Sequence, residues 1–545
     1  MKPFDPSGAF RNPVTTGNVR QLATRGAGAT LLAGGMGLAV QIVAAVALAR
    51  LLAPRDFGLV TMVTTFSLLF VNFGLNGFTE AIVQREEVNH ALATNLFWLN
   101  VVGSTLLAFA FAAGGALLAR LYHDARVAVV AQALAVTIFL CGLQVIPLAL
   151  LKRAMKFSAV SANDMVARAV SVVVSIVLAW AGWGYWALVV GTISLSLSAC
   201  IGAWILCRWK PGLPRRAEGT GSMVWFAVHT YGRFSTGYFT NNLDNFLVGW
   251  RLGATPLGFY KKAYDLFVLP SNQLSTGLTM VAVSALSRLQ KDAVRYKRYF
   301  LSALGVMAFV GMGISGDLTI VGRDLVLVLL GPKWAESGWL FTLFAPGIGF
   351  MLLYCTHIWV HLSLGRADRW FRWGLIDMVV TTAFLFTGLH WGSEGIAVAW
   401  VASYLVIVFP ALWYAGQPIQ LGILPVLSAV WKYIASAAIA ALAAFFIVQT
   451  SLSFMALPGA LWATMRLCSV SILFLALYVG VVIALHRGLA PIHQVIRLLR
   501  EMASRGQAAK PNSAEMAAPA PEIHASPVLA AEISTESLTK SGISA

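Results

Sequence analysis

The sequence predicts an all-α integral membrane protein with about 14 transmembrane helices. Hydrophobic residues make up 58% of the 545 positions, charged residues 11%, and the mean hydropathy is +0.76. A water-soluble protein of this length could not bury so large a share of apolar side chains in its core. Nearly uncharged windows of about 20 residues, the length that crosses a hydrocarbon core about 30 Å thick, recur along the chain. Examples are residues 28–48, 96–118, 170–186 and 467–485.

Apolar runs and the breaks between them predict the helices in order. We expect them near residues 27–50, 57–77, 96–119, 128–150, 165–182, 185–206, 223–250, 262–286, 300–320, 338–362, 373–391, 395–415, 433–450 and 464–486. The loops between them are too short to hold a soluble catalytic or nucleotide-binding domain. Residues 501–545 are rich in Ala, Pro, Ser and Glu and lack an apolar period, so we expect a disordered cytoplasmic tail.

Three pairs of segments indicate an internal duplication. Residues 50–58 (RLLAPRDFG) resemble 251–258 (RLGATPLG), 148–157 (LALLKRAMKF) resemble 362–371 (LSLGRADRWF), and the turn at 182–189 resembles 392–399. Each pair is separated by six expected helices, so the two halves keep the same topology and form parallel repeats. Transporter sites lie between repeats that move against one another, and this arrangement favours a transporter over a channel or an enzyme.

The repeats and the breaks between helices divide the chain into six expected parts. These are a cytoplasmic N-terminal segment (1–26), an N-lobe of helices 1–6 (27–207), a cytoplasmic linker (208–222), a C-lobe of helices 7–12 (223–415), helices 13–14 (416–490) and a cytoplasmic tail (491–545).

The net charge of +17 orients the protein in the membrane. With both termini in the cytoplasm, 27 Lys and Arg residues fall on cytoplasmic segments and 10 on periplasmic ones. This bias follows the positive-inside rule, so the charge implies no nucleic-acid partner. No cleavable signal sequence precedes the first apolar run. We therefore expect a multi-pass protein of a bacterial inner membrane.

The motif search argues against an enzyme. Neither a GxxxxGK[ST] phosphate loop nor an HExxH metal motif occurs, so we expect no cofactor and no ATP hydrolysis. His357 and His361 have the i, i+4 spacing of metal ligands, but no carboxylate or Cys completes a site. Core or interfacial packing is the preferred interpretation for this pair. Gly331 to Glu336 (GPKWAE) is expected to form a periplasmic elbow anchored by Trp334.

The seventh expected helix is unusually polar for a membrane span. At about 100° per residue, Arg233, Thr240, Asp244 and Arg251 fall on one stripe, with Asp244 about 16 Å along the helix from Arg233 and so near the midplane. Charged groups at that depth cost about 3 kcal/mol or more, so the stripe should face a wet cavity between the lobes. Asp244 would be an ion site, a proton relay or a partner to an arginine. The alternative is a purely structural polar contact.

Arg25 and Arg50 fall on one face of the first expected helix. Because the first and seventh helices are equivalent in the duplication, Arg50 and Arg251 would lie on opposite walls of one cavity. A planar guanidinium matches the oxygens of a diphosphate. The alternative is that Arg25, Arg50, Arg233 and Arg251 lie at helix ends and reach lipid headgroups without touching a substrate.

Four stretches resemble signatures of the polysaccharide-transport branch of the multidrug/oligosaccharidyl-lipid/polysaccharide exporter superfamily, which contains the Wzx-type flippases. They are residues 49–60 (ARLLAPRDFGLV), 146–157 (IPLALLKRAMKF), 243–270 (LDNFLVGWRLGATPLGFYKKAYDLFVLP) and 329–337 (LLGPKWAES). The resemblance covers roughly residues 20–490. It implies two pseudo-symmetric six-helix lobes around a V-shaped central cavity, followed by two C-terminal helices.

The resemblance also implies a function. The expected substrate is a polyprenyl-diphosphate-linked oligosaccharide, which is moved from the cytoplasmic to the periplasmic leaflet by alternating access for exopolysaccharide, capsule or O-antigen synthesis. Arg25, Arg50 and Arg251 match the places of cavity arginines on the first and seventh helices of lipid II flippases. Membrane lipids and the polymerase or export machinery are the other expected partners.

Three other readings remain open. A small-molecule or drug antiporter on the same fold would favour acidic cavity residues for cationic substrates, whereas the candidate residues are net basic. A membrane-embedded polymerase or ligase would place Arg and His residues in a large periplasmic loop, and every expected periplasmic loop is short. A scaffold for a synthase complex is the third.

Overall fold

The computed structural model describes residues 3–10, 19–85, 87–214, 220–451, 459–489 and 493. Its contacts divide the chain into two units, residues 1–494 and 495–545, and the second unit lies outside the described residues. The predicted tail therefore stays a prediction. In the part that is described, the only extended pairings are two isolated bridges, Phe4 with Phe10 and Ala9 with Asn89. The all-α class is confirmed.

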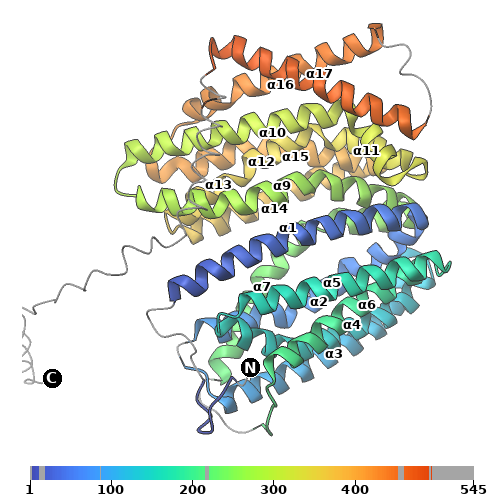
Figure 1. The fold of residues 1–545 in the computed structure, drawn as a ribbon, viewed down its shortest axis with the longest axis vertical. Coiled ribbons are helices and arrows are strands. Elements are labelled where there is room, and N and C mark those ends of the chain that lie inside the picture. Colours follow the sequence, from blue (N-terminus) through green and yellow to red (C-terminus); the bar gives the residue numbers. More distant parts are fainter. Residues whose placement is uncertain are drawn as a thin grey trace, which may run out of the picture. The chain divides into compact units, whose positions relative to one another are not determined.

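The first unit consists of long helices joined by short turns (Figure 1). Each of the 14 expected segments overlaps a helix or a run of short helices. The helices are α1 (Val19–Leu51), α2 (Pro54–Gln84), α3 (His90–Tyr122), α4 (Arg126–Arg153), α5 (Phe157–Trp180), α6 (Tyr185–Cys207), α7 (Thr220–Thr240), α8 (Leu243–Leu252), α9 (Ala254–Arg288), α10 (Ala293–Leu330), η1 (Pro332–Trp334), α11 (Ala335–Phe344), α12 (Pro346–Cys355), α13 (His357–Ser363), α14 (Ala367–Gly388), η2 (Leu389–Trp391), α15 (Gly392–Gly416), η3 (Gln417–Ile419), α16 (Ile423–Ser451) and α17 (Ala460–His486).

Two expected helices are broken in the structure. The segment expected at 338–362 forms α11, α12 and α13, and it bends by 53° where Pro346 begins α12. Proline lacks the N–H of a helical hydrogen bond, which explains the bend. The segment expected at 223–250 is interrupted at Asn241 and Asn242, so the prediction of one continuous seventh helix is wrong.

The side chains of the two asparagines explain the second break. The amide of Asn241 donates to the Gly237 carbonyl oxygen at 2.8 Å, and that of Asn242 donates to the Tyr238 carbonyl oxygen at 3.0 Å. Asparagine side chains that bond to the backbone in this way compete with the helical ladder. The chain consequently leaves α7 and starts again as α8.

Ten helical runs among the described residues are long and apolar enough to cross a membrane, or 11 if the bent run from Pro332 to Ser363 is one span. One of the ten, residues 367–419, contains both α14 and α15, which pack against each other. In α1, the apolar stretch counted among the described residues is Gly35–Leu51. The protein is a multi-pass membrane protein, and a total of 14 crossings stays a prediction.

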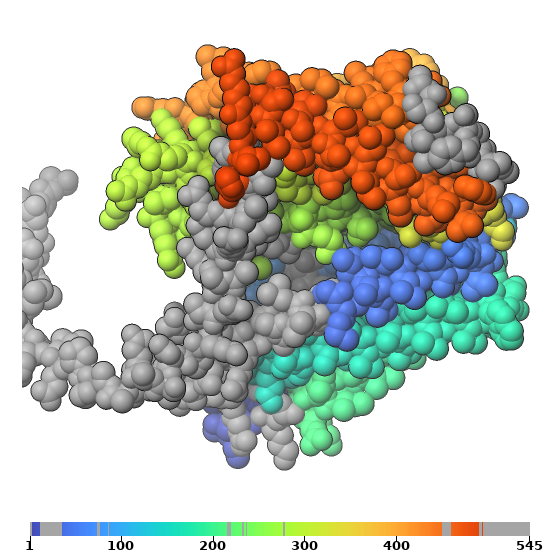
Figure 2. All heavy atoms as spheres, turned by 45° about the horizontal axis from the view of Figure 1, so that its top comes forward, coloured from blue at the N-terminus to red at the C-terminus, as the bar shows by residue number. Residues whose placement is uncertain are grey.

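The helices form two groups that meet along α2 and α9. In the first group α3, α2 and α6 pack on α4, while α5 packs on α6 and α1 packs on α5. In the second group α10 packs on α11, α12, α16 and α17, and α15 packs on α12 and α14. Figure 2 shows α16 and α17, in orange and red, covering α10, with α1 and α5 below.

The seventh expected helix departs from the pattern of the first. Whereas α1 packs along α5, its counterpart α7 contacts α14 sparsely and packs along α2 of the first group (Figure 1). The Tyr231 hydroxyl donates to the Leu69 carbonyl oxygen, and the Tyr238 hydroxyl donates to the Thr65 carbonyl oxygen, both at 2.9 Å. The following helix, α8, packs against α9 and α15 of the second group and also against α2 and α3 of the first. The chain therefore passes from the first group to the second over the short helix α8.

Candidate functional site

The two groups touch backbone to backbone at Gly58 of α2 and Gly258 of α9. A Cβ atom on Gly58 would lie 1.7 Å from the Ala254 carbonyl oxygen, and one on Gly258 would lie 1.9 Å from the Pro54 carbonyl oxygen. No side chain can be accommodated at such distances, so only glycine permits this crossing. The two glycines occupy equivalent places in the duplicated segments 50–58 and 251–258.

An indole side chain joins the groups beside this crossing. Trp334 of η1 is fully buried, and its Nε1 donates to the Ala49 carbonyl oxygen of α1 at 2.8 Å. Its ring makes edge contacts with Phe57 of α2 and Phe259 of α9, with ring centroids 5.4 and 6.0 Å apart. The residue expected to anchor an elbow at the membrane surface instead lies in the interior, between the two groups. A tryptophan in this place both fills space and satisfies its N–H.

Arg50 also bridges the two groups. It is exposed at the end of α1, and its Nη2 donates to the Val328 carbonyl oxygen of α10 at 2.8 Å. The Arg50 carbonyl oxygen accepts a hydrogen bond from Lys333 Nζ at 3.5 Å. One terminal nitrogen of the guanidinium, Nη2, is therefore engaged. The other two nitrogens of the group stay available to an anion.

Arg251 lies at the end of α8, seven residues before Gly258, and is exposed. Within the described residues its side chain makes no hydrogen bond or ion pair. The structure thus places Arg50 and Arg251 at the same end of the helices, each a short distance along the chain from the crossing glycines. The side chains of Arg25 in α1 and Arg233 in α7 lie outside what the structure describes.

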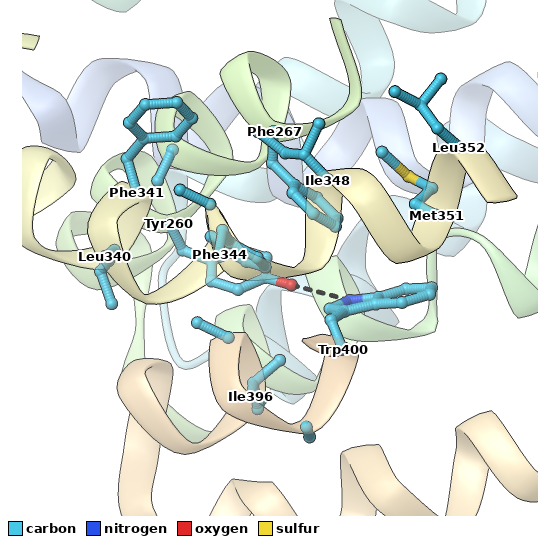
Figure 3. Close-up of a cluster of buried hydrophobic side chains, with 14 of the residues drawn as sticks. Tyr260, Phe267, Leu340, Phe341, Phe344, Ile348, Met351, Leu352, Ile396 and Trp400 are labelled. Atoms are coloured by element: carbon cyan, nitrogen blue, oxygen red, sulfur yellow. Dashed lines mark hydrogen bonds between the residues drawn. The ribbon is translucent and has the colours of Figure 1, made fainter. Parts of the chain in front are cut away.

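Asp244, in the first turn of α8, is completely buried. Its Oδ2 accepts hydrogen bonds from the Tyr260 hydroxyl at 2.7 Å and from Trp400 Nε1 at 3.1 Å, while its Oδ1 accepts one from the Asn245 backbone N–H at 2.7 Å. Trp400 Nε1 also donates to the Tyr260 hydroxyl oxygen at 3.1 Å (Figure 3). The carboxyl group therefore sits inside the second group, held by α9 and α15.

This placement corrects the stripe predicted for the seventh helix. Arg233 and Thr240 belong to α7, whereas Asp244 and Arg251 belong to α8, so one continuous helical face does not carry all four. Asp244 has no exposed surface with which to line a wet cavity. Its role in substrate or ion binding stays a prediction.

An ion pair on α9 was not predicted from the sequence. Lys261 Nζ lies 2.8 Å from Asp265 Oδ1, and both side chains are partly exposed. The neighbouring Lys262 places its ammonium 4.1 Å from the centre of the Phe57 ring, across the junction between the groups. The i, i+4 spacing of Lys and Asp could have been recognised in the sequence. The contact with Phe57 could not, because it joins residues 205 positions apart.

The comparisons with known proteins identify the family. The family described as "Polysaccharide biosynthesis protein" matches residues 47–338, more than half of the chain. The chain belongs to this family. The match contains the junction described above, from Ala49 to Trp334.

Several curated relatives carry transport or polysaccharide names. The succinoglycan biosynthesis transport protein ExoT of Rhizobium meliloti (strain 1021) is 22% identical over 354 residues, which are 65% of this chain and 72% of the relative. The teichuronic acid biosynthesis protein TuaB of Bacillus subtilis (strain 168) is 22% identical over 61% of this chain and 69% of its own length. The lipopolysaccharide biosynthesis protein WzxC of Escherichia coli (strain K12) is 25% identical, over 56% and 62%.

Solved structures share the fold. The lipid II flippase MurJ in an inward closed conformation superposes with a TM-score of 0.69 at 12% identity, over 84% of this chain and 98% of MurJ. An inward-facing multidrug resistance transporter of the MATE family superposes with a TM-score of 0.57 at 12% identity, over 70% and 94%. The protein therefore has the fold of the multidrug/oligosaccharidyl-lipid/polysaccharide superfamily, as the sequence resemblance implied.

Replacing Gly58 with alanine should destabilise the junction. The added Cβ would overlap the Ala254 carbonyl oxygen, and overpacking of this kind costs about 1–3 kcal/mol. We expect a lower midpoint of thermal unfolding for Gly58→Ala and for Gly258→Ala. Gly114→Ala in α3 is the matched control, because nothing lies within 4 Å of the place that its Cβ would take and alanine favours a helix. An equal shift for all three variants would contradict the close crossing.

Replacing Tyr260 with phenylalanine should destabilise the second group. The substitution keeps the ring and removes the hydroxyl that bonds to Asp244 and Trp400, and the loss of a hydrogen bond to a buried charged group costs about 1.5–3 kcal/mol. We expect a lower unfolding midpoint in detergent, whereas Tyr185→Phe on the partly exposed first turn of α6 should leave it unchanged. A stable Tyr260→Phe protein would show that the network around Asp244 contributes little.

Proposed function

We propose that this protein translocates a polyprenyl-diphosphate-linked oligosaccharide from the cytoplasmic to the periplasmic leaflet by alternating access. The observation that carries the proposal is the junction within the matched part of the chain, where two equivalent segments meet and each brings an arginine. The relatives ExoT and WzxC are named for succinoglycan transport and lipopolysaccharide biosynthesis, and MurJ is named as a lipid II flippase. These names support a lipid-linked sugar as the substrate.

Arg50 and Arg251 are the proposed ligands of the diphosphate. Guanidinium groups bind phosphate oxygens through parallel hydrogen bonds, and a doubly charged headgroup must lose much of its hydration on the way through the membrane. Arg251 is unpaired within the described structure, and Arg50 uses only Nη2 to bond to the Val328 carbonyl oxygen. Arg25, Arg233 and Asp244 remain proposed contributors to the same path.

The proposed alternating access uses the two groups of helices as the moving lobes. The crossing at Gly58 and Gly258, together with Trp334, closes one end of the junction. The apolar segments and the positive-inside rule together predict 14 crossings with both termini in the cytoplasm. In that topology, the end of the junction with the two glycines faces the periplasm. The described conformation then corresponds to a state closed towards the periplasm. Opening at this end must separate the glycines and withdraw the indole from Ala49.

A cation-coupled antiporter for small molecules is the second candidate. The observation that favours it is the shared fold with a multidrug transporter of the MATE family. The two candidates differ in the substrate that reconstituted protein moves. Flipping of a labelled prenyl-diphosphate sugar supports the first, and exchange of a cationic dye without such flipping supports the second.

Substitutions at the two arginines test the proposed diphosphate contacts. In proteoliposomes with a fluorescent short-chain prenyl-diphosphate-N-acetylglucosamine, we expect Arg251→Ala to slow flipping by about tenfold or more, the factor expected when a charged hydrogen bond is lost. Arg251→Lys should recover only part of the rate, because it loses the planar fork. Unfolding of the Arg251 variants should be unchanged, since the side chain is unpaired within the described structure.

Arg120→Ala is the matched control, because Arg120 is an exposed arginine at the same end of α3. Arg50→Ala should reduce both flipping and stability, since Arg50 also bonds to Val328. Wild-type flipping by the doubly substituted Arg50→Ala, Arg251→Ala protein would overturn the proposed site and leave the fold unaffected.

The position of the C-terminal tail tests the proposed topology. A reporter that works only in the cytoplasm should be active when fused after residue 510, because basic residues accumulate on the cytoplasmic segments. Activity of a periplasmic reporter fused at the same residue would refute the topology.

Deletion of residues 505–545 should leave polymer export intact, since the segment has no apolar run of membrane length. Lost export at normal protein level would assign the tail a function.

A further inference from the structure

A cavity of about 440 Å³ lies between α11, α14, η2 and the start of α15. Its size falls within the range of about 300–1,000 Å³ that is typical of ligand sites. Aromatic and aliphatic side chains dominate its lining, which also includes small residues of α14 and α15. The lining consists of Trp339, Leu343, Phe384, Thr387, Gly388, Trp391, Glu394, Gly395, Val398, Ala399 and Ala402.

The cavity opens away from the junction of the two groups. On α15, Ile396, Ala397 and Trp400 are buried, and Trp400 reaches Asp244 on the inner side. Val398 lies 200° around the helix from Ile396 and is 50% exposed. In an apolar membrane span, such an outward face meets lipid. Val398 and Ala402 lie about 200° around α15 from Trp400, and none of the lining residues is among those proposed to bind the diphosphate.

The cavity extends from the turn between α14 and α15 along the first turns of α15. Glu394 and Trp391 lie at the turn between α14 and α15, and Trp391 is 70% exposed. Ala402 lies eight residues further along α15, about 12 Å deeper. Tryptophan is typical of the boundary between headgroups and acyl chains. The polar lining residue Glu394 is thus at the level of the headgroups, and the apolar part lies at the level of the chains.

One carboxylate, that of Glu394, lines the cavity, and a guanidinium and a second carboxylate lie next to lining residues. Glu394 Oε1 accepts a hydrogen bond from Trp339 Nε1 at 2.8 Å, and Arg323 places its guanidinium 4.4 Å from the centre of the Trp339 ring. Glu336 lies close enough to Glu394 for their charges to interact. Two acidic groups with one basic group match a headgroup that is zwitterionic. They disfavour a diphosphate or an anionic lipid by like-charge repulsion.

We propose that this cavity binds one acyl chain of a phospholipid with an amine headgroup, of the phosphatidylethanolamine type. The ammonium group would bind Glu394 and Glu336, and the phosphate would bind Arg323. A primary ammonium offers three N–H donors to the carboxylates, whereas the trimethylated choline group keeps the charge and offers none. The site therefore distinguishes lipids by both charge and hydrogen bonding. Under the proposed topology the bound lipid belongs to the periplasmic leaflet.

Native mass spectrometry of the full chain in detergent tests this site. The probes are phosphatidylethanolamine, phosphatidylcholine and phosphatidylglycerol with identical acyl chains, and retention of each by the protein is measured. We expect retention to fall in that order. Glu394→Gln keeps an acceptor for Trp339 and removes the charge, so the preference for the ethanolamine lipid over the glycerol lipid should drop by about tenfold.

Two further variants separate the cavity from general lipid binding. Ala402→Phe fills the deep end and should abolish the retention of phosphatidylethanolamine at equal unfolding midpoint. Val406→Phe, one turn further along α15 on the same outward side and 52% exposed, is the matched control and should retain it. Equal retention of all three lipids, equal loss in both variants, or displacement by undecaprenyl phosphate would overturn the proposal.

Discussion

The contact between Gly58 and Gly258 is the constraint on which the arrangement of the two helical groups depends. Because neither residue has a side chain, α2 and α9 approach until each glycine meets a carbonyl group of the other helix. This approach brings Trp334 within reach of Ala49 and Arg50 within reach of Val328. A larger residue at either position would hold the groups apart, and the bonds of Trp334 and Arg50 across the junction would lengthen. The close approach of the two groups therefore depends on the lack of side chains at the two glycines rather than on a strong bond.

The network around Asp244 joins three helices of the second group. A carboxyl group buried in a membrane protein must be hydrogen-bonded, and three donors from α8, α9 and α15 meet this requirement. The aromatic rings of Tyr260, Phe267 and Phe344 pack next to it (Figure 3). The bonds of Asp244 therefore hold α8, which carries the exposed Arg251 in its last turn, against α9 and α15.

Each of the 14 apolar segments expected from the sequence overlaps a helix or a run of helices, because crossing a membrane requires apolar stretches of a minimum length. The duplication likewise identified Gly58 and Gly258 as equivalent, although only the structure showed that they touch. The break at Asn241 and Asn242 was missed, since hydropathy does not register side chains that compete with the backbone ladder. The partner of Asp244 on α15, Trp400, lies 156 positions away, and no spacing rule connects them. The apolar segments and the repeat were therefore predictable, whereas local competition by side chains and long-range contacts were not.

The placement of α7 against α2 has a mechanical consequence. The chain enters the second half at its linker, yet its first helix remains with the partner half, as an exchanged arm does in a domain-swapped dimer. The halves are thus joined through α7 as well as through the crossing glycines. A separation of α2 from α9 would either break the bonds of Tyr231 and Tyr238 to the backbone of α2 or change the course of the chain between α7 and α9. The interruption at Asn241 and Asn242 lies in this stretch, where the helical ladder is already broken.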